Sequence, residues 1–125
     1  MTTSSHIGPP TFCQWEVWQA EWDHEDGTTK ARPVLILSST ASAQANTHIW
    51  VAKFTKTFSQ IPFRIEFNNS DASFAETGLT DTCYLYVAET RRIPKTKFIR
   101  KRGKLSTLSA VVVAFTIKQA LKFQP

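Results

Sequence analysis

Short runs of alternating hydrophobic and polar residues make up most of this chain, a pattern typical of strands that bury one face. The alternation predicts strands over residues 14–22, 48–55, 63–67 and 83–87, and a short extended piece at 92–94. Residues 33–37 (PVLIL) are apolar throughout, which predicts a central strand buried on both faces. The polar segments 23–30 and 38–46 are predicted loops.

Only the end of the chain has helical spacing. Ser106 or Thr107 is a suitable N-cap, and Gly103 precedes them. The apolar residues that recur at helical intervals are Leu108, Val111, Val112, Phe115, Ala114, Ile117 and Leu121. This stripe predicts a terminal helix docked firmly on the sheet, although the β-branched run 111–113 would also suit a strand.

These elements predict a mainly β fold, a small and mostly antiparallel barrel with a C-terminal α-helix. Residues 1–11 are polar and contain a Pro-Pro pair, so we expect a flexible tail followed by one domain over 12–125. The chain has 125 residues, of which 42% are hydrophobic and 20% charged, as expected of a globular domain rather than a disordered chain. The longest apolar run, residues 110–115, is too short to cross a bilayer, and the first ten residues lack the features of a signal peptide. We therefore expect a cytoplasmic protein without a membrane anchor.

Charge is distributed unevenly along the chain. Lys and Arg number 15 against 10 Asp and Glu, a formal net charge of +5. The first 29 residues hold five acids and no Lys or Arg, whereas residues 91–125 hold ten basic residues and no acid. A basic block of this kind favours a polyanionic partner, either nucleic acid or an acidic protein segment, and a simple solvated face is the alternative.

Several kinds of chemistry find no support in the sequence. It contains no GxGxxG, Walker A or HExxH motif. Cys13 and Cys83 lie far apart in sequence, and the three histidines have no ligand spacing to them or to one another. We therefore expect no metal site and no cofactor, and two cysteines do not make a disulfide scaffold.

A series of segments, taken in order, resembles the MazF/PemK family of toxin endoribonucleases. The segments are residues 15–18 (WEVW), 30–38 (KARPVLILS), 51–55 (VAKFT), 61–63, 78–79, 91–93 and 103–106 before the terminal helix. The resemblance spans about residues 14 to 122 and implies an SH3-like barrel that forms a homodimer. It also implies cleavage of single-stranded RNA without a metal ion. A small cognate antitoxin, whose acidic or apolar tail occupies the RNA groove, is the implied protein partner.

RNA cleavage by 2′-hydroxyl attack requires a base, an acid and stabilisation of the extra phosphate charge. Arg32 suits the last task because its planar guanidinium holds two phosphate oxygens, unless it pairs instead with Asp26. The resemblance places an active-site threonine at Thr55, whose hydroxyl is able to hold a phosphate oxygen, unless it is an ordinary strand residue. Lys53 lies two residues earlier on the same face of the strand and therefore lines the same groove or faces solvent.

The chain departs from the family in three places. Many members have an aspartate shortly before the Arg/Lys-x-Ile segment, where this chain has Ala88 followed by Glu89. Glu89 is able to replace that aspartate only if the strand bulges, because a shift of one residue reverses the face. The family's first-loop glutamate corresponds to Glu25 or Asp26, with His24 as a possible general base, and the loop is otherwise simply solvated. Trp15 replaces the glycine that usually opens the first strand.

Other residues are candidates for binding RNA. Arg91 and Arg92 begin the basic block and are suited to phosphate contacts. Four aromatic side chains offer faces for stacking bases, although aromatics of small barrels usually lie in the core: Trp22, Trp50, Phe54 and Phe58. Trp22, beside the first loop, is the one we assign to function. Two other functions stay open: a non-catalytic SH3-like module that binds nucleic acid or a partner protein, and a gyrase-targeting toxin of the related fold.

Overall fold

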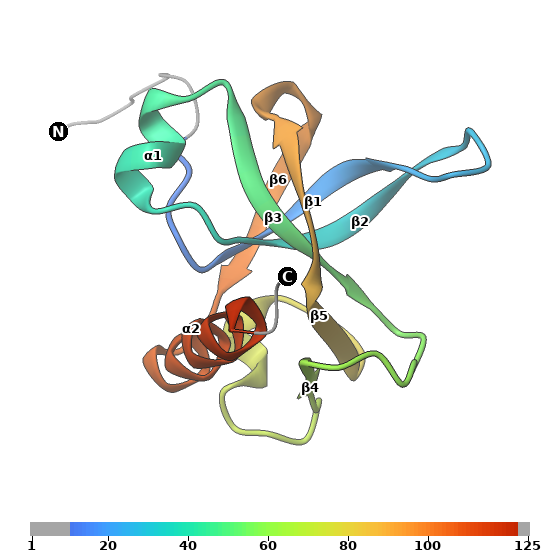
Figure 1. Cartoon of the computed structure of the whole chain (residues 1–125), viewed down its shortest axis with the longest axis vertical. Helices are drawn as coiled ribbons and strands as arrows, with labels where there is room; N and C mark the ends of the chain where they lie inside the picture. Colours follow the sequence, from blue (N-terminus) through green and yellow to red (C-terminus); the bar gives the residue numbers. More distant parts are fainter. Residues whose placement is uncertain (1–10, 123–125) are drawn as a thin grey trace, which may run out of the picture.

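A computed structural model of the chain describes residues 11–122, which form one six-stranded antiparallel sheet with two α-helices (Figure 1). The elements along the chain are β1 (Glu16–Asp23), β2 (Thr29–Ile36), α1 (Thr40–Ala45), β3 (His48–Thr55), β4 (Arg64–Phe67), the 3-10 turn η1 (Phe74–Thr77), β5 (Cys83–Pro94), the 3-10 turn η2 (Lys95–Lys97), β6 (Phe98–Lys104) and α2 (Thr107–Leu121). The strand order is β4-β5-β3-β2-β1-β6. The predicted mainly β fold with a C-terminal helix is confirmed. The predicted tail lies outside the described residues apart from Thr11.

The sheet is strongly curved but not closed into a barrel, since β4 and β6 remain its two edges within residues 11–122. Backbone contact bridges part of this opening. Gly78 has φ +70°, and a Cβ there would clash with the carbonyl of Arg102 on β6. A Cβ on Gly103 would likewise clash with the carbonyl of Glu76 in η1. The turn after η1 therefore packs directly against β6, and both glycines are required for it.

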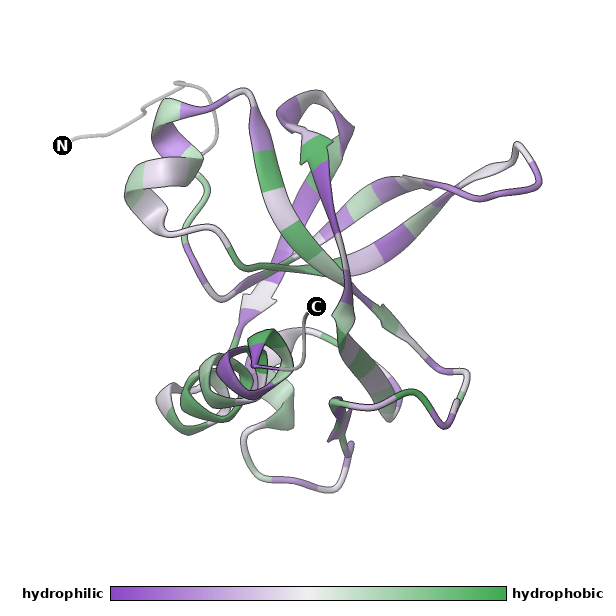
Figure 2. Cartoon of the chain, viewed as in Figure 1, coloured by the Kyte–Doolittle hydropathy of each residue, from purple (hydrophilic) through white to green (hydrophobic). Residues whose placement is uncertain are grey.

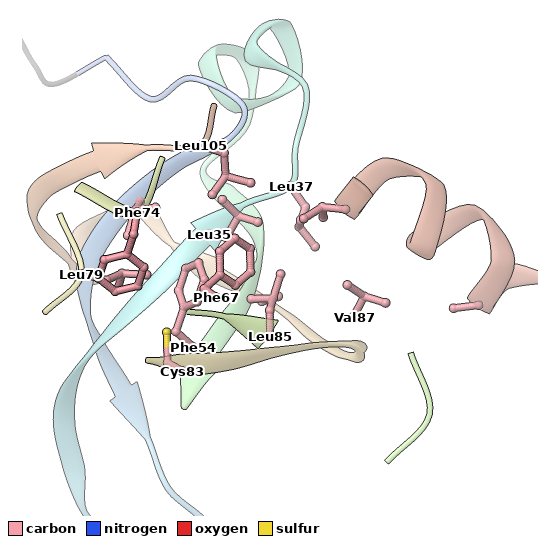
Figure 3. Packing of buried hydrophobic residues seen from close by; sticks show 14 residues of the cluster. Leu35, Leu37, Phe54, Phe67, Phe74, Leu79, Cys83, Leu85, Val87 and Leu105 are labelled. Atoms are coloured by element: carbon pink, nitrogen blue, oxygen red, sulfur yellow. The ribbon is translucent and has the colours of Figure 1, made fainter. Parts of the chain in front are cut away.

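Each face of the sheet carries a hydrophobic core, because the side chains of β3 alternate as predicted. Phe54 and Leu85 belong to the first core, which α2 covers (Figure 3). Ile49 and Val51 belong to the second core, together with Trp18 and Trp22 of β1. Strand β2 contributes to both cores, which confirms that it is a central strand buried on both faces.

Several predicted boundaries are wrong. Strand β2 begins at Thr29, so the predicted loop 23–30 is a short hairpin turn in which Gly27 has φ +86°. Helix α1 lies within the predicted loop 38–46, and its N-cap Ser39 accepts a hydrogen bond from the Ser42 amide. The pieces predicted at 83–87 and 92–94 are one long strand, β5. Strand β6 was missed because cationic side chains hide its alternation.

The C-terminal helix begins where predicted, with Ser106 as N-cap, and Ile117 of the predicted stripe packs against the first core, but most of that stripe does not dock. Leu108 is 75% exposed and Phe115 is 60% exposed. The opposite face, around Val113 and Ala120, packs on the first core. Apolar residues surround most of α2 (Figure 2), so periodicity alone did not identify the docked face.

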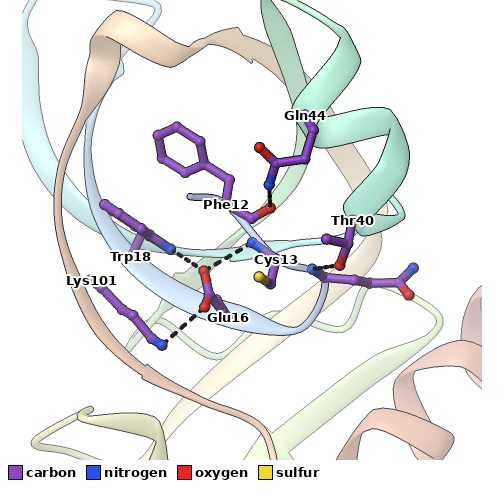
Figure 4. Close-up of polar contacts among 8 residues, drawn as sticks. Phe12, Cys13, Glu16, Trp18, Thr40, Gln44 and Lys101 are labelled. Carbon is purple, nitrogen blue, oxygen red and sulfur yellow. Dashed lines mark hydrogen bonds and ion pairs between the residues drawn. The ribbon is translucent and has the colours of Figure 1, made fainter. Parts of the chain in front are cut away.

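A buried carboxylate fixes the start of the domain to the sheet (Figure 4). Glu16 is only 7% exposed, and its Oε1 accepts hydrogen bonds from the Cys13 amide (3.0 Å) and Trp18 Nε1 (2.9 Å). Its Oε2 lies 2.9 Å from Lys101 Nζ on β6. Between Cys13 and Glu16, Trp15 adopts φ +72°, a left-handed conformation that favours glycine.

Candidate functional site

A groove crosses the sheet at the C-terminal half of β3 and consists of two compartments. The β6-side compartment, of about 470 Å³, is lined by residues that include Arg32, Lys53, Thr55, Lys56, Asp81 and Arg102. The hairpin-side compartment, of about 710 Å³, is lined by residues that include Trp22, His24, Asp26, Lys53, Thr55, Tyr86, Glu89 and Arg91. Both compartments share Lys53, Thr55 and Thr57. Most of the predicted site residues therefore meet in one continuous groove.

Strand pairing explains why the cations of this groove converge. Lys53 pairs with Val34 of β2, and Arg91 pairs with Val51 of β3. Both valines belong to the second core, so their cross-strand partners project from that same face of the sheet. The cationic groove thus extends directly from the second core.

Lys53 lies between two other cations, which affects its protonation. Burial lowers the pKa of Lys53, and the nearby charges of Arg32 and Arg91 lower it further, against a smaller opposing effect of Glu89. Arg32 donates a hydrogen bond to the Ala31 carbonyl (3.0 Å) and forms no ion pair with another residue in 11–122. The alternative pairing of Arg32 with Asp26 is therefore wrong. These cations form no ion pair with an acid among residues 11–122, and such a cluster favours binding of an anion.

The two compartments differ in charge. The β6-side compartment has four cations and one acid, Asp81, whose Oδ2 already lies 3.0 Å from Lys56 Nζ. The hairpin-side compartment has four carboxylates, from Asp23, Glu25, Asp26 and Glu89, against the cations Lys53 and Arg91. A phosphate is therefore favoured at Arg32 and Lys53, and groups that donate hydrogen bonds are favoured on the hairpin side.

The pairing of β5 is irregular near Glu89, which was expected to replace the family's aspartate only if the strand bulges. On β3 one residue separates Ala52 from Phe54, whereas four residues separate their partners on β5, Thr90 and Leu85. The extra residues form a bulge next to Glu89, which lies in the groove lining, while Ala88 is not part of that lining. The condition under which Glu89 replaces the family's aspartate is met.

The hairpin turn holds the other candidate acid and base. Asp26 Oδ1 accepts hydrogen bonds from the amide (3.0 Å) and hydroxyl (2.6 Å) of Thr28, and these bonds lower the pKa of Asp26. The charge of His24 lowers it further. Nε2 of His24 is buried and has no hydrogen-bond partner among the described residues, although it lies in the groove lining. This nitrogen therefore lacks a protein partner within residues 11–122, and a substrate group reaches it only if the hairpin turn shifts.

Two predictions about RNA-binding residues do not hold. Arg92 pairs with Trp50, which packs against the first core, and it lines neither compartment. Trp22 lines the groove but is only 6% exposed, because Arg91 and Lys53 cover its ring at 3.9 and 5.3 Å from the centroid. Trp22 therefore holds cations in place and does not present a free face to a base.

Sequence reasoning missed two polar groups of the groove. Arg102 donates hydrogen bonds to Gln19 Oε1 and to the Gly78 carbonyl, both at 2.9 Å, but it lies on the unpredicted strand β6. Tyr86 uses its hydroxyl to hold the segment after β3, where it donates to the Thr57 carbonyl (3.0 Å) and accepts from the Ser59 amide (2.7 Å). The alternation of residues 83–87 placed Tyr86 on the strand without indicating this long-range contact.

Residues 11–122 include no group of three or more His, Cys, Asp or Glu side chains arranged to hold a metal ion. Neither α-helix in the described part of the chain has the length and apolar character needed to span a membrane.

Comparison with known proteins gives one family match and many similar structures. Residues 13–121 match the family described as "PemK-like, MazF-like toxin of type II toxin-antitoxin system". A comparison with curated proteins found no match. Mycobacterium tuberculosis toxin MazF-mt6 has a similar structure, with TM-score 0.70, 24% identity, and coverage of 88% of this chain and 99% of that one.

Two further similar structures contain a second protein. An endoribonuclease in complex with its cognate antitoxin, from a mycobacterial species, gives TM-score 0.70 at 18% identity, covering 90% of this chain and 97% of that one. MazE-MazF from Deinococcus radiodurans gives TM-score 0.71 at 12% identity, covering 93% and 100%. At these identities the similarity shows a shared fold.

Proposed function

This chain belongs to the PemK-like, MazF-like family of type II toxin–antitoxin toxins, and from that premise we propose that it is a cytoplasmic endoribonuclease that cleaves single-stranded RNA without a metal ion. The resemblance predicted from the ordered segments is thereby confirmed at the level of the family. The observation that carries the proposed activity is the meeting of Arg32, Lys53, Thr55 and Glu89 in one groove. These groups come from three strands, and together they supply a phosphate clamp and a carboxylate.

The chemistry assigns a role to each group. Arg32 and Lys53 hold the scissile phosphate and stabilise the additional negative charge of the phosphorane. The Thr55 hydroxyl, which accepts a hydrogen bond from the Thr57 amide (3.2 Å), is free to donate its proton to a phosphate oxygen. The attacking 2′-hydroxyl and the leaving 5′-oxygen then face the hairpin-side compartment, whose lining includes Glu89 and His24.

Proton transfer is assigned to the acidic side of the groove. Glu89 removes the proton of the 2′-hydroxyl, which attacks the phosphorus as the 5′-oxygen leaves. His24, which lies in the lining of this compartment, donates a proton to that leaving oxygen. The products are a 2′,3′-cyclic phosphate and a 5′-hydroxyl end, so the step needs neither a metal nor a water molecule.

The test is incubation of the purified protein with single-stranded RNA in excess chelator. Wild type is expected to cut the RNA, and Arg32→Ala is expected to lower the rate by about 100-fold or more. Arg92→Ala is the matched control, since Arg92 is a cation outside the groove. Equal cleavage by wild type and Arg32→Ala would refute the catalytic assignment. Salt-dependent RNA binding without products would favour the non-catalytic module, and trapped DNA breaks would favour the gyrase-targeting alternative.

Two protein partners complete the proposal. The similar structure of an endoribonuclease in complex with its cognate antitoxin supports binding of a cognate antitoxin by this chain. The basic groove suits an acidic segment of such a partner. We also propose a homodimer, because α2 presents apolar side chains to solvent that a second copy would cover.

A further inference from the structure

One aromatic ring beside the groove is half exposed, in contrast to the other aromatics that the sequence offered for stacking. Phe58 is 49% exposed, whereas Trp22 and Phe54 are almost completely buried. Phe58 lies in the connection between β3 and β4, and its neighbours Thr57 and Ser59 both line the hairpin-side compartment. In Figure 1 this connection and the β1–β2 hairpin project on the same side of the molecule. Phe58 therefore lies at the rim of the groove.

The segment that carries Phe58 is held in place from both sides. The Tyr86 hydroxyl donates to the carbonyl of Thr57 and accepts from the amide of Ser59, the residues immediately before and after Phe58. Arg64 Nη1 donates to the Ser59 carbonyl (3.1 Å). A ring that is exposed on a segment with three such contacts is preorganised, so a ligand that binds it needs little ordering of the chain.

Two neighbouring side chains shape a stacking surface around this ring. The guanidinium carbon of Arg64 lies 4.3 Å from the Phe58 centroid, and the Tyr84 ring meets Phe58 edge-on at 5.6 Å and 78°. A nucleobase stacks on aromatic rings and on guanidinium planes alike, and the positive charge of Arg64 attracts the phosphate next to it. A hydrophobic peptide would instead require a wider apolar patch without a cation above the ring.

We propose that Phe58, Arg64 and Tyr84 form a stacking platform for one unpaired base of single-stranded RNA, adjacent to the cleavage groove. This inference rests on the proposed function, because it takes the scissile phosphate to lie at Arg32 and Lys53. The four carboxylates of the hairpin-side compartment disfavour phosphates there, so a strand that continues across it turns its bases towards the protein. Phe58 offers a half-exposed aromatic ring beside that compartment.

A binding experiment separates this site from catalysis. The probe is a short fluorescein-labelled oligouridine with 2′-O-methyl groups, which the proposed reaction is unable to cleave. Phe58→Ala is expected to weaken the affinity about 5- to 20-fold, and Phe58→Trp is expected to retain it. Ile99→Ala is the matched control, since Ile99 is 53% exposed on β6 and lines neither compartment. Melting temperatures of all variants show whether each is folded.

A second measurement locates the base directly. Oligouridine that contains 5-iodouridine is irradiated with the protein, and the cross-linked residue is identified by mass spectrometry. The expected cross-link is to Phe58 or Tyr84, and it is expected to be absent when the same strand is paired in a duplex.

The outcomes distinguish the platform from the nuclease proposal. RNA binding by folded Phe58→Ala at wild-type affinity, with cross-links elsewhere in the groove, would overturn the platform and leave the nuclease proposal intact. Platform-dependent binding by a wild-type protein that cuts no RNA would support the platform and overturn the nuclease proposal. If wild type binds no single-stranded RNA and Phe58→Ala weakens only an acidic antitoxin peptide, both fail.

Discussion

The guanidinium of Arg91 lies 3.9 Å from the centre of the Trp22 ring and donates a hydrogen bond to the Asp23 carbonyl (2.9 Å). Trp22 and Asp23 end β1, whereas Arg91 lies on β5, 68 residues away from Asp23 in sequence. The contact therefore fixes the β1–β2 hairpin against the strand that carries Glu89. Lys53 also lies over the Trp22 ring, so the contact keeps the positive charges of Arg91 and Lys53 close together.

Replacing Arg91 tests whether this cation contributes to RNA binding. Arg91→Ala is expected to weaken binding of single-stranded RNA about 10-fold and to reduce the slope of log K against log salt by about one. Arg92→Ala is the matched control, because its side chain projects from the opposite face of β5. Fluorescence anisotropy over a range of salt concentrations measures both. Equal losses for the two variants would indicate a diffuse basic surface instead of a specific contact.

Lys53 illustrates an expected conflict between stability and binding. The pKa of Lys53 is lower in the folded protein than its ordinary value of 10.5, so the unfolded chain holds this proton more tightly. The free energy of unfolding therefore rises with pH between the lowered pKa and 10.5. At neutral pH the charged side chain is unfavourable in the free protein. Lys53→Met is therefore expected to raise the melting temperature by about 2 to 4 °C at pH 7 and to weaken RNA binding. A lower melting temperature at pH 7, or a difference that grows towards high pH, would contradict this assignment.

Much of the fold follows from the sequence because most strands have one buried and one exposed face. The bounds of β3 and the start of α2 were predicted correctly, since alternation and an N-cap are local signals. Strand β6 was not predicted because Arg100, Lys101, Arg102 and Lys104 obscure its period. Its place in the sheet depends on pairing with β1, a contact between distant segments.

The sequence predicted most of the residues that line the groove, but only part of their spatial arrangement. Alternation along β3 placed Lys53 and Thr55 on one face. The choice between Ala88 and Glu89 depends on a bulge that only the pairing of β5 with β3 reveals. The difference in exposure between Trp22 and Phe58 has a similar cause, because the burial of an aromatic ring depends on which distant side chains cover it.

The exposed face of α2 predicts the oligomeric state. Leu108, Val111, Val112 and Phe115 are 45 to 75% exposed along this helix. Wild type is expected to have the mass of a dimer by light scattering at micromolar concentration, and Phe115→Glu is expected to shift it to a monomer. The matched control is Ile99→Glu, an equally exposed position on β6. A monomeric wild type would refute the homodimer.

Glu16 predicts sensitivity to acid. Burial raises its pKa, but hydrogen bonds from Trp18 and Cys13 and the charge of Lys101 outweigh that effect, so the pKa lies below 4.5. The carboxylate therefore contributes stability above pH 4.5 that is lost as the pH falls through the lowered value. Glu16→Gln is expected to lose about 2 kcal/mol of unfolding free energy at pH 7, and progressively less as the pH falls through the lowered pKa, by urea denaturation. A loss that is independent of pH would indicate packing alone.

At Trp15 we expect a glycine variant to be more stable than an alanine variant, the reverse of the usual order. Its backbone is held at φ +72° because its amide donates to the Ile36 carbonyl and its carbonyl accepts from the Leu105 amide, both at 2.9 Å. Trp15→Gly and Trp15→Ala lose the same ring, but only glycine adopts this conformation without strain, so the glycine variant is expected to be more stable by about 1 kcal/mol. At Ile99, where φ is not positive, alanine is expected to be more stable than glycine by about 0.5 to 1 kcal/mol. Urea denaturation midpoints of the four variants measure both differences. The same order at both positions would show that the strain is absent, and the glycine usual at this place in the family would then need another explanation.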